Sequence, residues 1–128
     1  MRDHRDLDAW IRAIQLAKSV YEVTAEYPRQ ELYGLAAQMR RSAVSIASNI
    51  AEGAARHGDK EFVRFLHMSL GSASELDTQI EISLAVGMGN QERLRDLQNS
   101  TYRVSQLTHG LIRYLRSRQK PLPSAENR

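Results

Sequence analysis

The sequence predicts an all-α fold, an antiparallel four-helix bundle whose helices run up-down-up-down. Apolar residues recur every three or four positions along four long segments, which is the period of a helix rather than the alternation of a strand. Short stretches with proline or glycine separate these segments, and short connections make consecutive helices antiparallel neighbours. Ala, Leu, Ile and Val dominate the apolar residues, and aromatics are only 6%, which favours helices.

The chain length of 128 residues suits a single domain with its own core. We expect residues 1–118 to form the bundle and residues 119–128, which include two prolines and little to bury, to form a disordered tail. The chain has no cysteine, so disulfides and thiolate metal sites are excluded, and the composition is compatible with the cytoplasm, where we expect the protein. No run of 18 apolar residues exists, so no membrane span is expected.

The first helix is expected at residues 7–27, with Asp6 as its N-cap and Pro28 ending it. Its apolar residues form two sets about half a turn apart. A helix with one buried face needs an apolar stripe of only about 100°, so this helix has apolar surface to spare. The first set comprises Leu7, Trp10, Ile14, Ala17, Tyr21 and Thr24, and the second comprises Leu16, Val20, Val23 and Tyr27.

The second helix follows a short connection at residues 28–33 and extends to about Ala54. It carries apolar residues on two neighbouring faces, so we expect it to pack on two sides, one of them against another subunit. The first line is Leu35, Met39, Ala43, Ile46 and Ile50, and the second line is Ala37, Val44, Ala51 and Ala55.

The third helix is expected from Asp59, as N-cap, to Val86, and the fourth from about Asn90 to Arg116. Residues 69–74 in the third helix are mostly small, which lets another helix come close. The expected core line of the third helix is Phe62, Phe65, Leu66, Ser69, Ala73, Leu76, Ile80 and Leu84. The fourth helix carries a heptad-like line of Leu94, Leu97, Thr101, Val104, Thr108, Leu111 and Leu115.

Motifs that carry known chemistry are missing from the sequence. The residues three positions before His57, His67 and His109 are not glutamates, so the Glu-x-x-His pattern of di-iron bundles is absent. No serine sits in a Gly-x-Ser-x-Gly elbow, and residues 87–89 lack the third glycine of a dinucleotide loop. We therefore expect no catalytic residues, metal ligands, cofactor or small-molecule substrate, and we do not expect an enzyme.

A polar set on the second and third helices has two interpretations. It contains Arg41, Asn49 and Glu52 on one helix and Glu61, Arg64 and Glu75 on the other. These residues either form ion pairs at or near the surface that fix the helix register, or they form a polar network buried between subunits. The second interpretation follows because the second helix is expected to pack on two sides, which leaves it little further surface for polar residues outside a contact.

Residues 103–120, at the end of the fourth helix and just after it, form a basic run that contains no acidic residue. Cations at a helix C-terminus are favourable in themselves, because they face the negative end of the helix dipole. The alternative is a stripe that contacts phosphates of nucleic acid, which the mild net charge of +3 permits without requiring it. The candidate nucleic-acid-binding residues are Arg95, Arg103, Arg113 and Arg116.

Five segments together resemble one known family. These are residues 7–10, 33–35, 40–54, 59–66 and 71–79, and the likeness extends from about Asp6 to Tyr114. The stretch at 40–54, Arg-Arg-Ser-Ala-Val-Ser-Ile-Ala-Ser-Asn-Ile-Ala-Glu-Gly-Ala, resembles the signature of the bacterial four-helix bundle proteins encoded in intervening sequences of large-subunit ribosomal RNA genes. Its polar positions, with those matched on the third helix, are Arg40, Arg41, Asn49, Glu52, Arg64 and Glu75.

The resemblance implies a bundle without established enzymatic activity. The family is related in fold to the accessory protein of diversity-generating retroelements, a basic pentamer that binds nucleic acid and a reverse transcriptase. The resemblance therefore implies a homo-oligomer, with a pentamer favoured. Our leading hypothesis is that this oligomer binds RNA, DNA or a nucleoprotein partner. The alternative is a structural or protein-interaction scaffold that binds no nucleic acid.

Overall fold

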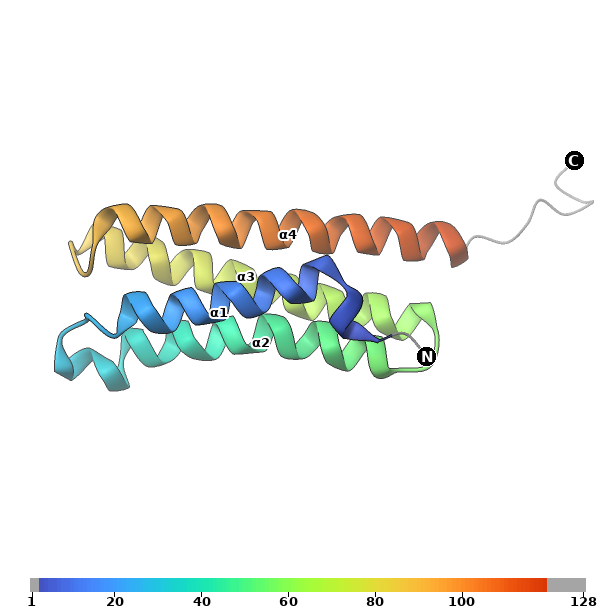
Figure 1. The fold of residues 1–128 in the computed structure, drawn as a ribbon, viewed down its shortest axis with the longest axis horizontal. Helices are drawn as coiled ribbons and strands as arrows, with labels where there is room; N and C mark the ends of the chain where they lie inside the picture. Colours follow the sequence, from blue (N-terminus) through green and yellow to red (C-terminus); the bar gives the residue numbers. More distant parts are fainter. Residues whose placement is uncertain (1–2, 120–128) are drawn as a thin grey trace, which may run out of the picture.

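The computed structural model describes residues 3–119, which form four long helices lying side by side (Figure 1). The helices are α1 (Asp8–Thr24), α2 (Leu35–Ala55), α3 (Asp59–Ala85) and α4 (Gln91–Gln119). Two short 3-10 helices, η1 (His4–Asp6) and η2 (Arg29–Tyr33), precede α1 and α2. No strand occurs in this part of the chain, so the all-α prediction is confirmed. Gln119 ends α4, and the rest of the predicted tail lies outside the described residues.

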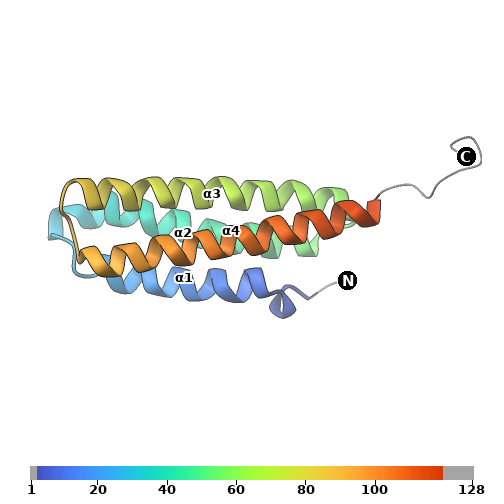
Figure 2. The same cartoon turned by 90° about the horizontal axis from the view of Figure 1, so that it is seen from above.

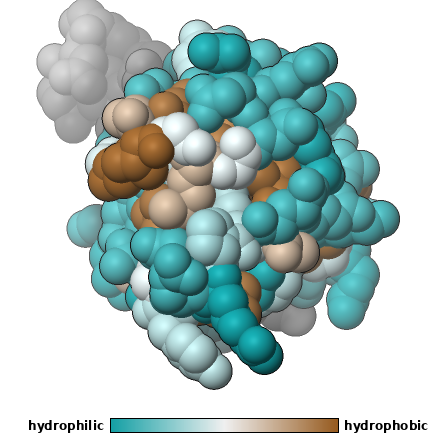
Figure 3. All heavy atoms as spheres, turned by 90° about the vertical axis from the view of Figure 1, so that its left-hand side faces the viewer, coloured by the Kyte–Doolittle hydropathy of each residue, from teal (hydrophilic) through white to brown (hydrophobic). Residues whose placement is uncertain are grey.

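The four helices form a square in which consecutive helices are neighbours. Helix α2 packs mainly against α1 and α3, and α4 packs mainly against α3 and α1 (Figures 1 and 2). The α1–α2 and α3–α4 connections lie at the same end of the bundle, and the α2–α3 connection lies at the other, which confirms the up-down-up-down topology. The end with two connections is mostly hydrophilic, with separate hydrophobic patches (Figure 3).

The two ends of α1 differ from the prediction. Leu7 is the N-cap and makes no side-chain capping bond, while Asp6 belongs to η1, so the prediction of Asp6 as the cap is wrong. The reason is that Asp3 caps the short 3-10 turn first, by accepting a hydrogen bond from the Arg5 N–H at 2.9 Å. Helix α1 also ends at Thr24, and the chain turns before Tyr27.

The second apolar set on α1 faces the core, whereas in the first set only Thr24 is fully buried. Leu16, Val20 and Val23 of the second set are buried, together with the small residues Ala9 and Ala13. In the first set, Ile14 and Tyr21 remain 44% and 46% exposed, while Leu7, Trp10 and Ala17 pack partly against the core. Helix α1 therefore has apolar surface beyond what the bundle core covers, as its sequence predicts.

Helices α2 and α3 pack closely because small side chains line their contact. The predicted core line of α2 is buried from Met39 to Ile50, with Leu35 at its edge. The Ser69 hydroxyl donates to the Ile46 carbonyl at 2.9 Å, so a buried polar group of α3 is satisfied by the backbone of α2.

At the start of α3, Gly58 (φ 87°) is the N-cap and Asp59 is the first helical residue, so the predicted cap is one position off.

The heptad-like line on α4 is confirmed except near its end. Leu94, Leu97, Val104 and Leu115 are buried, as are the two threonines of the line. Ile112 is buried where Leu111 was expected, and Leu111 is only partly buried. An α-helix drifts by about 20° per heptad relative to a strict seven-residue repeat, so the core-facing position shifts over a long helix.

Tyr27 joins the two connections at one end of the bundle. Its hydroxyl donates to the Ser83 Oγ of α3 at 2.7 Å. Its ring lies against Gly89 in the α3–α4 turn, where an added Cβ would come within 2.7 Å of the ring. Burial raises the pKa of the Tyr27 hydroxyl, and its hydrogen bond with Ser83 opposes that rise.

Candidate nucleic-acid interface

The four candidate arginines of α4 are all exposed, but the structure does not gather them into one cluster. Arg95 and Arg113 lie on the same line of the helix, 18 residues or about 27 Å apart. Arg103 lies on the flank that faces α1, and Arg116 lies on the flank that faces α3. The cations are therefore spread along and around α4.

The arginines of α4 differ in what they contact. Within residues 3–119, no ion pair involves Arg95, Arg103 or Arg113. The Arg116 guanidinium donates to His67 Nε2 of α3 at 3.1 Å. Arg118 forms an ion pair with Asp59 at 3.1 Å and lies over the Tyr114 ring, so it ties the end of α4 to the start of α3. Lys120 falls outside the described residues.

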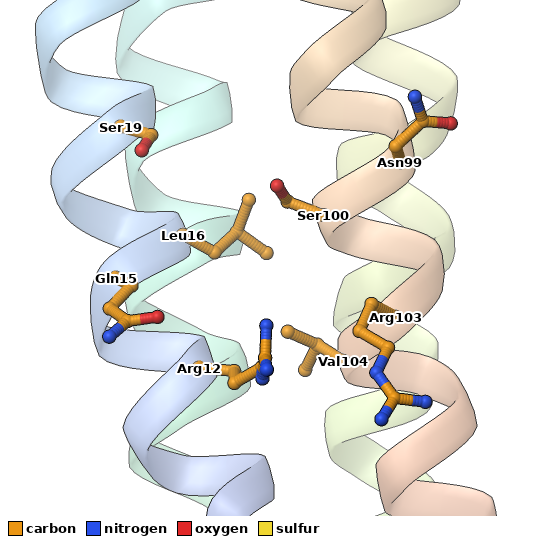
Figure 4. Close-up of a pocket in the computed structure, with 8 residues that line it drawn as sticks. All are labelled: Arg12, Gln15, Leu16, Ser19, Asn99, Ser100, Arg103 and Val104. Atoms are coloured by element: carbon orange, nitrogen blue, oxygen red, sulfur yellow. The ribbon is translucent and has the colours of Figure 1, made fainter.

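A groove of about 350 Å³ between α1 and α4 brings Arg103 together with Arg12 (Figure 4). The Arg12 side chain extends from α1 toward α4, and Arg103 lies on the opposite wall. Arg12 is not among the residues predicted to bind nucleic acid, because in the sequence it is only one member of the polar face of the first helix. Its position opposite Arg103 depends on the register between two helices that are distant in sequence. The lining residues are Arg12, Gln15, Leu16, Ser19, Asn99, Ser100, Arg103 and Val104.

Four of the six family-motif residues make contacts within the chain, and these are Arg40, Asn49, Glu52 and Arg64. Arg40 Nε donates to Thr24 Oγ1 at 2.9 Å, and its guanidinium lies over the Tyr21 ring, so it holds α2 against the end of α1. Asn49 Nδ2 donates to the Ser45 carbonyl one turn earlier at 2.9 Å.

The two ion pairs that involve the polar set join residues close in sequence. Glu52 of α2 pairs at 3.2 Å with Arg56, the residue that follows the helix, and Glu61 pairs with Arg64 at 3.1 Å on α3. The hydrogen bond from Arg64 lowers the pKa of the Glu61 carboxyl. No ion pair joins α2 to α3 in the part of the chain that the structure describes.

Arg41 and Glu75 line a second groove, between α2 and α3, with a volume of about 410 Å³. Neither has an ion pair within residues 3–119. Gln79 lines the same groove, and its buried Oε1 has no hydrogen-bond partner. This groove carries one cation and one anion, whereas the α1–α4 groove carries two cations.

A third groove, of about 670 Å³, lies between α1 and α2 and has more apolar walls. Tyr21, Leu32 and Val44 contribute to it and are 46%, 36% and 44% exposed, and Arg40 and Arg41 also line it. Val44 belongs to the second apolar line predicted for α2, and this line lies outside the bundle core. The apolar surplus of α1 and the second line of α2 therefore meet on one face.

Residues 3–119 contain no group of three or more His, Cys, Asp or Glu side chains placed to hold a metal ion. Within the same range, none of the helices is long and apolar enough to cross a membrane.

Comparison with known proteins gives one family and one fold. A family model described as 23S rRNA-intervening sequence protein matches residues 5–110. A solved structure, described as a protein of unknown function from the S23 ribosomal protein family of Bacteroides thetaiotaomicron, superimposes with a TM-score of 0.73 at 20% sequence identity. The match covers 81% of this chain and 97% of that one. A search of curated proteins finds no match. Neither description names a catalytic activity.

Proposed function

The chain belongs to the 23S rRNA-intervening sequence protein family, and we propose that within it this protein is a non-enzymatic, cytoplasmic homo-oligomer that binds RNA, DNA or a nucleoprotein partner. The observation that carries the proposal is the set of exposed arginines without ion pairs, Arg95, Arg103 and Arg113 on α4. An exposed guanidinium without a carboxylate partner is the group that neutralises a backbone phosphate.

Oligomerisation is supported by the apolar face shared by α1 and α2. Tyr21 and Val44 leave nearly half of their surface exposed on either side of one groove. Contiguous exposed apolar surface of this kind marks protein contacts. The neighbouring Ala37 and Ala51 are small enough for another helix to approach closely. A ring of five copies is the arrangement that the family resemblance implies.

We expect light scattering of the purified protein in dilute buffer to give a multiple of the chain mass of 14.6 kDa, with five copies favoured. Val44→Asp should lower that mass, because it places a charge on the apolar face while leaving the core intact. Tyr102→Asp, a change at a 67% exposed residue of α4, is the control and should keep the oligomer. A mass of one chain for the unaltered protein would exclude the homo-oligomer.

Binding is expected to depend on phosphates and not on base sequence. The candidate arginines lie on the exterior of a bundle, and no element of residues 3–119 has the arrangement of a groove-reading motif. One subunit offers only a few such charges, so assembly into an oligomer should raise the affinity.

Replacing Arg113 and Arg116 with Gln should weaken binding to all sequences by a similar factor. Each lost phosphate contact should also flatten the salt dependence on duplex DNA by about 0.9 log units of affinity per log unit of salt. The measurement is a mobility shift or anisotropy titration with RNA and DNA at two salt concentrations. Unchanged binding by the double variant would mean that Arg113 and Arg116 do not contact the phosphates. Absence of binding by the unaltered protein would favour the alternative function, a structural or protein-interaction scaffold without nucleic-acid binding.

A further inference from the structure

The charged lining residues of the α1–α4 groove are Arg12 and Arg103, and none is a carboxylate. The α1–α2 groove also has two arginines and no carboxylate in its lining, but there Arg40 is held by Thr24 and the Tyr21 ring. The amides Gln15 and Asn99 and the hydroxyls Ser19 and Ser100 complete the polar lining, and all of these can donate hydrogen bonds. Leu16 and Val104 form the apolar part between the two helices.

Both arginines line the same groove from opposite helices, and no acid is among the lining residues. The Arg12 guanidinium extends toward α4, and the Arg103 side chain lies along α4 (Figure 4). Neither has an ion pair within the described residues, whereas Arg93 on the same α1–α4 seam is paired with Glu26 at 2.6 Å. Two guanidiniums across one groove repel each other, and an anion held between them turns that repulsion into attraction. Arginine also matches phosphate geometry through its planar fork of donors.

We propose that the α1–α4 groove is a phosphate-binding site in which Arg12 and Arg103 hold one backbone phosphate of a nucleic-acid strand from two sides. This inference rests on the proposed function, nucleic-acid binding, and assigns one of the phosphate contacts to this groove. The groove, of about 350 Å³, has room for one phosphate with its sugar but not for a duplex. Glu22 and Asp96 lie one turn beyond Ser19 and Asn99, and Asp8 lies one turn before Arg12. Acidic residues therefore flank the site at both ends on α1 and at one end on α4.

The test is a fluorescence anisotropy titration of the full chain with labelled single-stranded RNA. Arg12→Gln should weaken binding about tenfold, the loss expected for one charge-assisted hydrogen bond. Arg95→Gln is the control, because it removes the same charge from an exposed α4 position outside the groove, and it should weaken binding less. The Arg12→Gln/Arg103→Gln double variant should bind more tightly than the product of the two single effects predicts, because both residues share one phosphate.

Competition distinguishes the source of the phosphate. Displacement of the labelled RNA by unlabelled RNA but not by inorganic phosphate supports a backbone phosphate, and displacement by inorganic phosphate alone would overturn the assignment to a strand. If the unaltered protein binds RNA while Arg12→Gln equals Arg95→Gln, the groove is not the site and the proposed function survives. If the unaltered protein binds neither RNA nor DNA, both fail together.

Discussion

Ile46→Asp is expected to leave the chain largely unfolded in far-UV circular dichroism. Ile46 has no exposed surface and lies in the middle of the α2 core line. The change removes a buried side chain worth about 2–5 kcal/mol and inserts a carboxylate without a partner, which costs several kcal/mol more. The free energy of unfolding of a domain this size is only about 5–15 kcal/mol, so the loss is comparable to the whole.

The matched control is Ile82→Asp, the same substitution on α3 at a residue that is 46% exposed. This variant should keep the helical spectrum and a cooperative melt, with a loss of about 0.5 kcal/mol, as is usual for surface changes. Both melts should be recorded at one protein concentration, since an oligomer's stability depends on it. A melt of Ile46→Asp close to that of the unaltered protein would mean that this face of α2 is not the core.

The helices and their buried faces could be predicted because periodicity reports burial directly. Met39, Ala43, Ile46 and Ile50 recur at helical spacing and are all fully buried. The helix starts were less accurate, because several residues near a boundary can cap a helix. The conformation of the preceding loop makes Leu7 the N-cap in place of Asp6, and Gly58 in place of Asp59. The hydrophobic periodicity of the sequence carries little information about loop conformation.

The candidate site was less predictable, because pairing depends on residues far apart in the sequence. The sequence shows that Arg118 belongs to a basic run, but only the fold brings it close to Asp59. Likewise, Arg12 and Arg103 line one groove because the core fixes the register between α1 and α4. The sequence predicts which cations are exposed, whereas the fold determines which of them lie beside an acid.

Gly53→Ala is expected to destabilise the protein although alanine is the better helix former. A Cβ at Gly53 would lie 2.8 Å from the Phe65 Cβ and 2.9 Å from the Phe62 Cδ1. The Phe65 Cβ is attached to the backbone, so α2 and α3 must move apart to make room. Overpacking of this kind costs about 1–3 kcal/mol, which exceeds the gain of about 1 kcal/mol in helix propensity.

Gly71→Ala on α3 is the matched control, because it makes the same change where the added Cβ has no atom within 4 Å. Gly71 is exposed, so the gain in helix propensity should appear alone, as a stabilisation of up to about 1 kcal/mol. A change of 1 kcal/mol corresponds to a shift in Tm of about 4 °C for a domain of this size, so the two variants should shift in opposite directions. A higher Tm for both would show that the α2–α3 contact has room at Gly53 and that the glycine is not needed for the close approach of the two helices.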